Sequence, residues 1–199
     1  MTAPASYASA PSAARGTADL CAVADLSDDA RALLAGGAPP PPPKDFIARL
    51  AERNLQADAV RFLAHALPRR ESVWWAWVCA RKTAGAEPPP PIKAALDATE
   101  RWIVQPSEEH RRQTLIFGEA ADFGTAAGCA ALAAFMTGGS LAPPDAPAVP
   151  PGEFMTAKAV SGAVTLAAVA TEPDKAGEKF NEFLRLGLEV AERTRLWPA

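Results

Sequence analysis

Three tryptophans within four residues, inside residues 69–81, constrain this chain more than any other feature. Successive residues of an α-helix step round its axis by about 100°. Trp75 and Trp77 therefore point to nearly opposite sides, with Trp74 between them. Further apolar residues cover much of the remaining circumference: Val73, Val78 and Cys79. A helix that is apolar nearly all round is a buried helix, so we expect this segment to be the central helix of the fold.

Tryptophan and arginine are common in binding hot spots, but side chains that point in opposite directions cannot form one exposed patch. We therefore expect the tryptophans to be structural, with Arg70 and Arg81 marking where the helix meets water. Each arginine has two alternatives, stacking on an indole or pairing with an acid such as Glu119. The residues predicted to form the structural core are Trp74, Trp75, Trp77, Cys79, Trp102 and Cys129.

Apolar residues recur at helical spacing along most of the chain, and no stretch shows the two-residue alternation of a strand. This pattern predicts an all-α fold, an irregular bundle of about eight helices arranged as hairpins with proline-rich connections. No known repeat signature is present, which favours a bundle over a regular solenoid. The expected helical stretches are residues 27–34, 44–53, 56–66, 69–82, 91–104, 107–123, 125–136, 153–170 and 171–195.

Local signals set several helix ends. Ser27 and Ser107 each precede two acidic residues, which is typical of an N-cap followed by a first turn. Gly36 and Gly37 are expected to stop the first of these helices. Asn54 separates the next two. The alanine- and glycine-rich helix at residues 125–136 is expected to pack against the tryptophan helix, since small and large side chains complement each other.

Proline, at 20 residues, is about twice as frequent as the usual share of roughly 5% and is clustered. The pattern predicts three regions: a disordered leader at residues 1–16, a short helix and polyproline linker at 17–43, and a single all-helical domain at 44–199. The run of prolines from 39 to 43 is interpreted as a stiff strut. A ligand for a proline-binding domain is the alternative for this run.

The overall charge and the cysteine spacing argue against several classes of protein, namely nucleic-acid binders, zinc proteins and disulfide-linked secreted proteins. A net charge of −3 and a pI near 5.5 argue against nucleic acid as a partner. Three widely spaced cysteines form no zinc or disulfide pattern, so we expect reduced thiols in the cytoplasm. The leader lacks the apolar segment of a signal peptide. No run approaches the length of a membrane span.

Candidate catalytic groups are few. The acids Glu119 and Asp122 lie three residues apart and are expected to share one helix face, on the same acid-rich helix as His110. Residue 107 is serine, where a di-iron bundle motif needs a glutamate three residues before the histidine. Phosphate-binding loops and nucleophile elbows are absent from the sequence. We therefore expect a protein that is not an enzyme and has no cofactor or metal.

Residues 67–81 carry the string Leu-Pro-Arg-Arg-Glu-Ser-Val-Trp-Trp-Ala-Trp-Val-Cys-Ala-Arg. This string resembles the signature of an uncharacterised bacterial family, Leu-Pro-x-Arg-x-x-Val-Trp-Trp-Ala-x-x-Cys. The resemblance spans about residues 44–140 and implies a gene context near type VI secretion clusters. The family brings no activity or catalytic residues that can be transferred to this chain.

Taken together, these features predict a non-catalytic interaction or accessory module with another protein as partner, in association with a bacterial secretion system. Its possible interaction residues are Arg70, Arg81, Glu119 and Asp122. The alternative is a binder of a hydrophobic small molecule or lipid, in a cavity between small-residue helices and the tryptophans. A third hypothesis is an enzyme that uses Glu119, Asp122 and His110. The sequence leaves the oligomeric state open.

Overall fold

The computed structural model describes residues 15–34 and 39–197, and this part of the chain is helical without any strand. The predicted all-α class is confirmed. The described residues form ten α-helices: α1 Thr17–Val23, α2 Asp28–Ala32, α3 Pro43–Glu52, α4 Gln56–Ala66, α5 Arg69–Thr83, α6 Pro90–Val104, α7 Glu108–Ala120, α8 Ala126–Phe135, α9 Met155–Val169 and α10 Ala176–Arg193. A short 3₁₀ helix, η1 Pro173–Lys175, leads into α10.

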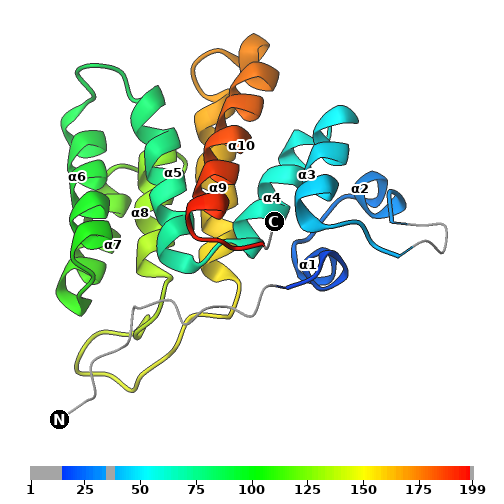
Figure 1. Ribbon diagram of the computed structural model, residues 1–199. Helices are drawn as coiled ribbons and strands as arrows, with labels where there is room; N and C mark the ends of the chain where they lie inside the picture. Colours follow the sequence, from blue (N-terminus) through cyan, green and yellow to red (C-terminus); the bar gives the residue numbers. More distant parts are fainter. Residues whose placement is uncertain (1–14, 35–38, 198–199) are drawn as a thin grey trace.

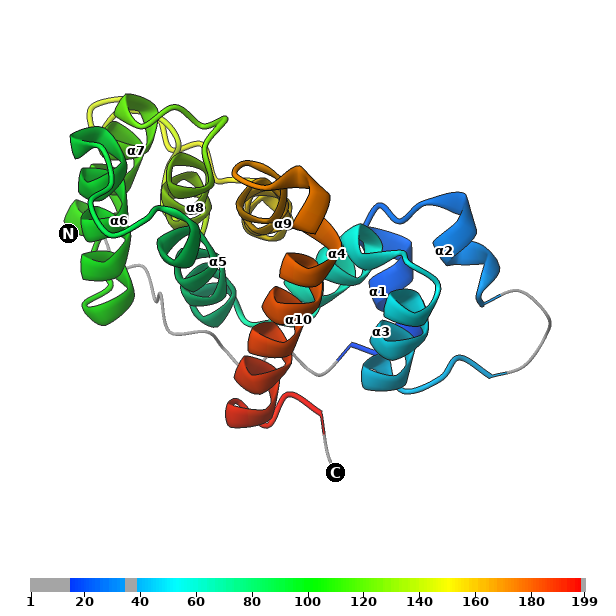
Figure 2. The same ribbon diagram turned by 90° about the horizontal axis from the view of Figure 1, so that it is seen from above.

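The helices form an irregular two-layered bundle (Figure 1). Seen from above, α6, α5 and α10 form one layer, and α7, α8 and α9 form the layer behind it (Figure 2). The first four helices lie beyond α9 and α10, at the end of the molecule opposite α6 and α7. Helix α8 contacts α5, α6, α7 and α9, so it lies at the centre of the bundle.

Small residues let α8 occupy this central place. Eight of its ten residues are buried, and most of them are alanines. A Cβ atom added to Gly128 would lie 2.1 Å from the carbonyl oxygen of Asp122, so only glycine allows this approach. One added to Gly118 of α7 would lie 3.0 Å from the Cβ of Ala131. The predicted packing of this small-residue helix against the tryptophan helix is present.

The tryptophan helix is buried on part of its circumference, and the prediction that it is buried all round is wrong. Trp75 is completely enclosed, whereas Trp74 and Trp77 are half-buried and pack against the core from its edge. The reason is that α5 lies in an outer layer, with α8 and α9 behind it and α6 at its side. Trp77 lies toward α6, where its indole N–H donates a hydrogen bond to the carbonyl of Leu96 (3.0 Å).

The predicted caps and breaks have clear outcomes. Ser27 and Ser107 each accept a hydrogen bond from the backbone N–H three residues later, as expected of N-caps. Asn54, with φ of 58°, separates α3 from α4. Helix α7 ends at Ala120, before Phe123, because Asp122 adopts a positive φ of 64°. The last helix begins at Ala176, after the 3₁₀ turn, and not at Thr171.

The segment before α3 contributes to the main core. Leu20 and Ala24, in and after α1, are fully buried, and so is Ala30 of α2. Ser27 joins this segment to α4, since its N–H and hydroxyl donate to the buried carboxylate of Asp58 (both 2.9 Å). Most of the predicted leader, residues 1–14, and the predicted stop at Gly36 and Gly37 lie outside the described residues.

None of the described helices is both long enough and apolar enough to cross a membrane.

Candidate functional site

The residues predicted to form the structural core lie in different surroundings. Trp75, Cys79, Trp102 and Cys129 are buried, and Trp74 and Trp77 are half-buried. Trp75 links two helices, because its indole N–H donates to the carbonyl of Phe183 on α10 at 2.7 Å. Burial raises the pKa of the Cys79 thiol, and it raises that of Cys129 to about 11. A thiol that stays protonated is a poor nucleophile, so these cysteines act in packing.

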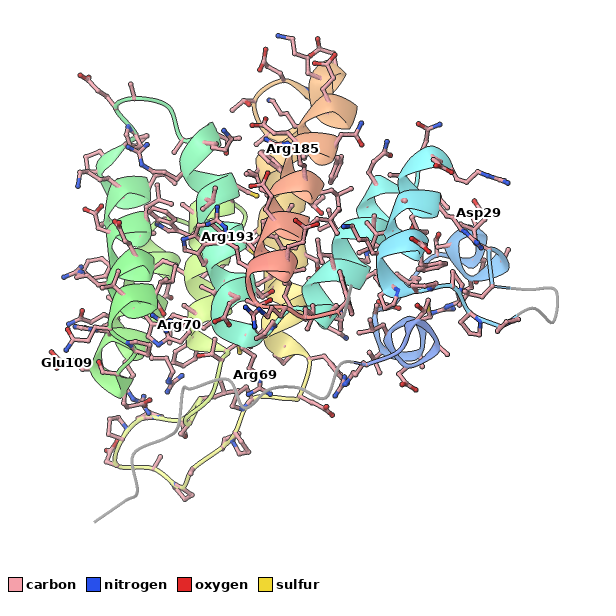
Figure 3. All side chains as sticks on the ribbon, in the orientation of Figure 1. Asp29, Arg69, Arg70, Glu109, Arg185 and Arg193 are labelled. Atoms are coloured by element: carbon pink, nitrogen blue, oxygen red, sulfur yellow. The ribbon has the colours of Figure 1, made fainter. Side chains whose placement is uncertain are left out.

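The four residues predicted for interaction do not form one surface. Arg70 donates to the carbonyl of Ile103 at 2.7 Å, and Arg81 donates to the carbonyl of Gly85 at 3.3 Å. Both arginines therefore satisfy backbone groups of neighbouring segments; Figure 3 shows Arg70 beside the lower end of α5. Glu119 and Asp122 are exposed. The Asp122 carboxylate accepts a bond from the N–H of Gly124, within its own turn.

The structure does not bring Glu119, Asp122 and His110 together. His110 and Glu119 are nine residues apart on α7, which corresponds to about 13 Å along the helix axis. Asp122 lies in the turn beyond the helix, and its positive φ removes it from the face that the spacing predicted. No group of three metal-ligating side chains occurs among the described residues. These three residues thus have no shared site in which to act.

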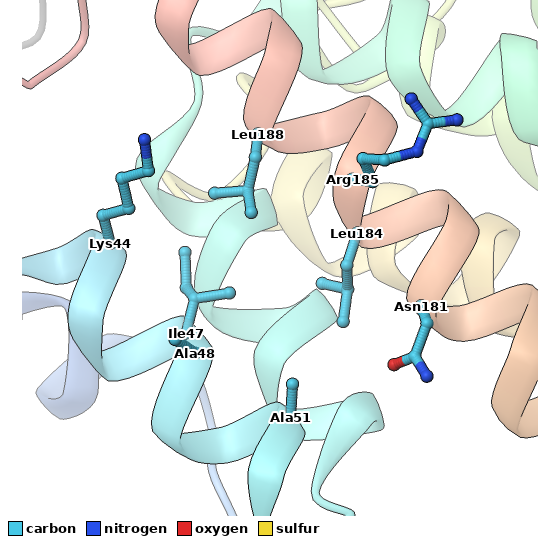
Figure 4. Close-up of a pocket in the computed structure, with 8 residues that line it drawn as sticks. All are labelled: Lys44, Ile47, Ala48, Ala51, Asn181, Leu184, Arg185 and Leu188. Atoms are coloured by element: carbon cyan, nitrogen blue, oxygen red, sulfur yellow. The ribbon is translucent and has the colours of Figure 1, made fainter.

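A groove between α3 and α10 is the better candidate. It has a volume of about 260 Å³, and Figure 4 shows side chains from the two helices facing each other across it. One wall comes from α3 and the other from α10. The lining residues are Lys44, Ile47, Ala48, Ala51, Asn181, Leu184, Arg185 and Leu188.

Each of the two helices that line the groove is fixed in place by its buried side, which packs against other helices. On α3, the ring of Phe46 packs against that of Phe62 on α4, with ring centroids 5.1 Å apart. On α10, Phe183 is buried beside α5. Helix α4 contacts both α3 and α10. Among the apolar lining residues, Ile47 and Leu184 are buried, whereas Ala48, Ala51 and Leu188 are at least partly exposed.

The polar groups of the groove are hydrogen-bond donors or amides. Lys44 pairs with Glu192 at 2.7 Å, and Arg185 pairs with Glu189 one helical turn away. Asn181 contributes a carboxamide on the α10 wall, one turn before Arg185. Neither glutamate lines the groove, so its lining holds two cations and no carboxylate.

Sequence reasoning did not identify the groove, although it predicted both helices, at residues 44–53 and 171–195. Ile47 and Ala51 follow helical spacing in the first stretch, and Leu184 and Leu188 do so in the second. Nothing in either stretch shows that these residues face each other, because the two stretches are more than a hundred residues apart and meet only in the folded chain.

Comparison with known proteins places the chain in a family. A family model, described as a family of unknown function (DUF6931), matches residues 46–191, which is more than half of the chain. The chain belongs to this family. The DUF6931 match begins in α3 and ends in α10, so it contains the tryptophan segment and every groove residue except Lys44. Neither a curated protein nor a solved structure matches the chain.

Proposed function

We propose that this protein is a non-catalytic interaction module that binds a segment of a partner protein in the groove between α3 and α10. The observation that supports this proposal is an open groove with apolar walls on two helices that are each anchored in the core. Hollows between the helices of a bundle are common places for a ligand or partner to bind, and Ala48, Ala51 and Leu188 leave the apolar lining of this one partly open to water. Arg70, Arg81, Glu119 and Asp122 play no part in this proposal, because they lie on other elements.

A hydrophobic small molecule or lipid is a weaker second candidate. Pockets for drug-sized ligands usually enclose roughly 300–1,000 Å³, whereas the groove measures about 260 Å³ and is open to solvent. The expected ligand position beside the tryptophans is also occupied. A Cβ added to Gly187 would lie 2.7 Å from Trp75 and from Leu63, so α10 already fills that space. Side chains of a partner protein fit the groove better.

The wider setting is part of the same proposal. We infer that the partner belongs to a bacterial secretion apparatus and that the complex forms in the cytoplasm. This inference is supported only by the resemblance of residues 67–81 to a family with that gene context. Inspection of the genes that neighbour DUF6931 members tests it.

Site-specific photo-cross-linking in the native cell tests the docking proposal. A benzophenone amino acid is placed at Ala48 or at Asn181, on opposite walls of the groove, and at exposed Ala120 of α7 as the control. We expect one and the same adduct from both groove positions and none from Ala120. Filling the groove with Ala48→Trp should abolish the adduct at Asn181. No adduct, or one that persists in the filled variant, would contradict the proposal.

A further inference from the structure

We propose that His65 and Phe154 form an acid-sensitive latch between α4 and the start of α9, which opens when the His65 imidazole takes up a second proton. His65 lies near the end of α4, and the Phe154 ring, directly before α9, packs on its imidazole with 5.6 Å between ring centroids. Opening moves Phe154 away from α4 while the bundle stays folded. Neither residue lines the groove between α3 and α10, so the latch is independent of docking there.

The imidazole of His65 is buried and uses only one of its two nitrogens. Its Nδ1 lies 2.7 Å from the carbonyl oxygen of Arg61, which can only accept, so Nδ1 carries the proton. Its Nε2 is buried too, and no group in the described part of the chain bonds to it. A second proton makes Nε2 a charged donor without an acceptor, which is costly in a buried place. The protonated ring is therefore stable only where water reaches Nε2.

Phe154 can move aside at little cost to the core. Its side chain is half-buried, and the connection that leads to it, residues 142–153, is largely exposed. Helix α9 begins without a side-chain cap at Phe154. The next turn is held more firmly, because buried Thr156 donates to the carbonyl of Met136 at 2.8 Å. A displacement of Phe154 therefore ends at the first turn of α9 and leaves the rest of the helix in place.

Arg15 joins the chain before α1 to the latch. Its guanidinium lies 5.0 Å from the centroid of the Phe154 ring and pairs with Glu153 at 2.6 Å. The side chains of this ion pair are 34% and 61% exposed, so the pair is weak on its own. Arg69 of α5 donates only to the backbone carbonyl of Glu153, at 3.3 Å. Arg15 therefore leaves α4 together with Phe154 when the latch opens.

The charges around His65 disfavour the protonated ring while the latch is closed. Burial lowers the pKa of His65, the Arg61 carbonyl raises it, Lys158 of α9 and Arg15 lower it further, and Asp25 after α1 raises it. The described residues of α3 and α10, which also pack against α4, contribute no charge to this balance. An open, hydrated ring binds a proton more readily than the closed one, so a falling pH favours the open state.

A fluorine label on Phe154 tests the latch in the full-length chain. We place para-fluorophenylalanine at position 154, or at fully buried Phe62 of α4 as the matched control, and record fluorine NMR spectra from pH 8 to 4. The label at 154 should move toward its position in the unfolded chain, with a midpoint below the ordinary histidine pKa of 6.5. The label at 62 and the tryptophan fluorescence should not change through this transition, because the bundle stays folded.

Two conservative charge changes test whether His65 is the titrating group. Lys158→Gln removes a repulsion and should raise the midpoint, whereas Asp25→Asn removes an attraction and should lower it. Asparagine tolerates the positive φ of 51° at position 25. His65→Asn should abolish the transition. The latch would be overturned by a label at 154 that stays in place, that moves only when the tryptophan fluorescence changes, or that keeps the same midpoint in the charge variants.

Discussion

Arg111 is completely buried, although it carries a charge. Its guanidinium binds both carboxylate oxygens of Glu108 (2.7 Å each) and donates to the carbonyls of Phe135 (2.6 Å) and Ser140 (2.9 Å). It also lies over the ring of Phe135, 4.4 Å from its centroid. One side chain of α7 thus holds the end of α8 and the start of the proline-rich connection to α9.

Replacement of Arg111 by methionine should lower the free energy of unfolding by about 2 to 4 kcal/mol, because two carbonyls and a carboxylate lose charged donors. Arg112→Met is the matched control. Arg112 shares Glu108 and the same connection, but its side chain is 26% exposed, so water replaces its bonds and the cost should be smaller. Urea unfolding followed by circular dichroism measures both. Equal losses would contradict the role assigned to Arg111.

His65 is a second buried polar residue with a defined protonation state. Its Nδ1 lies 2.7 Å from the carbonyl oxygen of Arg61, which can only accept, so Nδ1 carries the proton. Nε2 faces no hydrogen-bond partner in the described part of the chain. Burial lowers the pKa of His65, the Arg61 carbonyl opposes this shift, and the positive charges of Lys158 and Arg15 lower the pKa further.

This lowered pKa predicts acid sensitivity. The unfolded chain binds a proton at His65 near its ordinary pKa of 6.5, while the folded chain resists protonation to a lower pH. The stability from the neutral ring is therefore complete above about pH 6.5 and is lost as the pH falls below it. Unfolding midpoints between pH 8 and 5 measure the loss. His65→Asn, which keeps a donor for Arg61, should reduce the pH dependence, and an unchanged pH dependence in this variant would contradict the role assigned to His65.

These residues show what sequence can and cannot predict at this scale. Burial of Trp75 follows from local helical periodicity, which needs only neighbouring residues. For Arg111 the sequence shows Glu108 one turn earlier, a pattern typical of exposed helices. Its other partners are 24 and 29 residues away, and no local pattern places them beside it. The groove is hidden for the same reason, since its walls are more than a hundred residues apart.

At the scale of elements, α10 contains two glycines with opposite roles. Gly187 lies where α10 crosses α5 and α4, and an added Cβ would be 2.7 Å from Trp75 and Leu63. Gly177, in the first turn of the same helix, would place its Cβ in open space. The close approach at Gly187 lets Trp75 reach the Phe183 carbonyl, so this crossing fixes one wall of the groove.

Alanine substitution should separate the two glycines. Gly187→Ala should destabilise the protein by about 1 to 3 kcal/mol through overpacking, despite the better helix propensity of alanine. Gly177→Ala should be neutral or stabilising by up to about 1 kcal/mol, because only propensity changes. Thermal or urea unfolding of the two variants gives the comparison. Stabilisation by both would show that α10 can move away from Trp75 at little cost.

The sequence predicts a helix end correctly where a single local residue determines it. It does not do so where packing against another helix determines the end. Ser27, Asn54 and Ser107 act through bonds or dihedral angles within four residues, and their predictions are confirmed. Helix α7 ends before Phe123 at the positive φ of Asp122, and Gly128 of α8 comes so close that an added Cβ would lie 2.1 Å from the Asp122 carbonyl oxygen. This approach involves another helix, so the local spacing that predicted a helix to Phe123 carried no sign of it.

At the scale of the whole molecule, the two N-terminal helices α1 and α2 share a core with the helical bundle that begins at α3. Residues 17–34 bury Leu20, Ala24 and Ala30 in the same apolar cluster as α4, and Ser27 bonds to the buried Asp58. The residues predicted as a separate domain begin only at position 44. The contacts at α4 favour one cooperative unit, since the removal of α1 would expose part of the shared core.

Leu20→Ala tests this coupling with an internal reporter. All five tryptophans lie at position 74 or later, so their fluorescence follows the body of the bundle and not α1 itself. Leu20 is fully buried, and its truncation should cost about 2 to 5 kcal/mol. If α1 and the bundle unfold together, the tryptophan midpoint in urea falls by the full amount, and half-buried Leu33→Ala lowers it less. An unchanged midpoint, with loss of amide-exchange protection confined to α1 and α2, would instead show that they fold on their own and that the cooperative domain begins at α3.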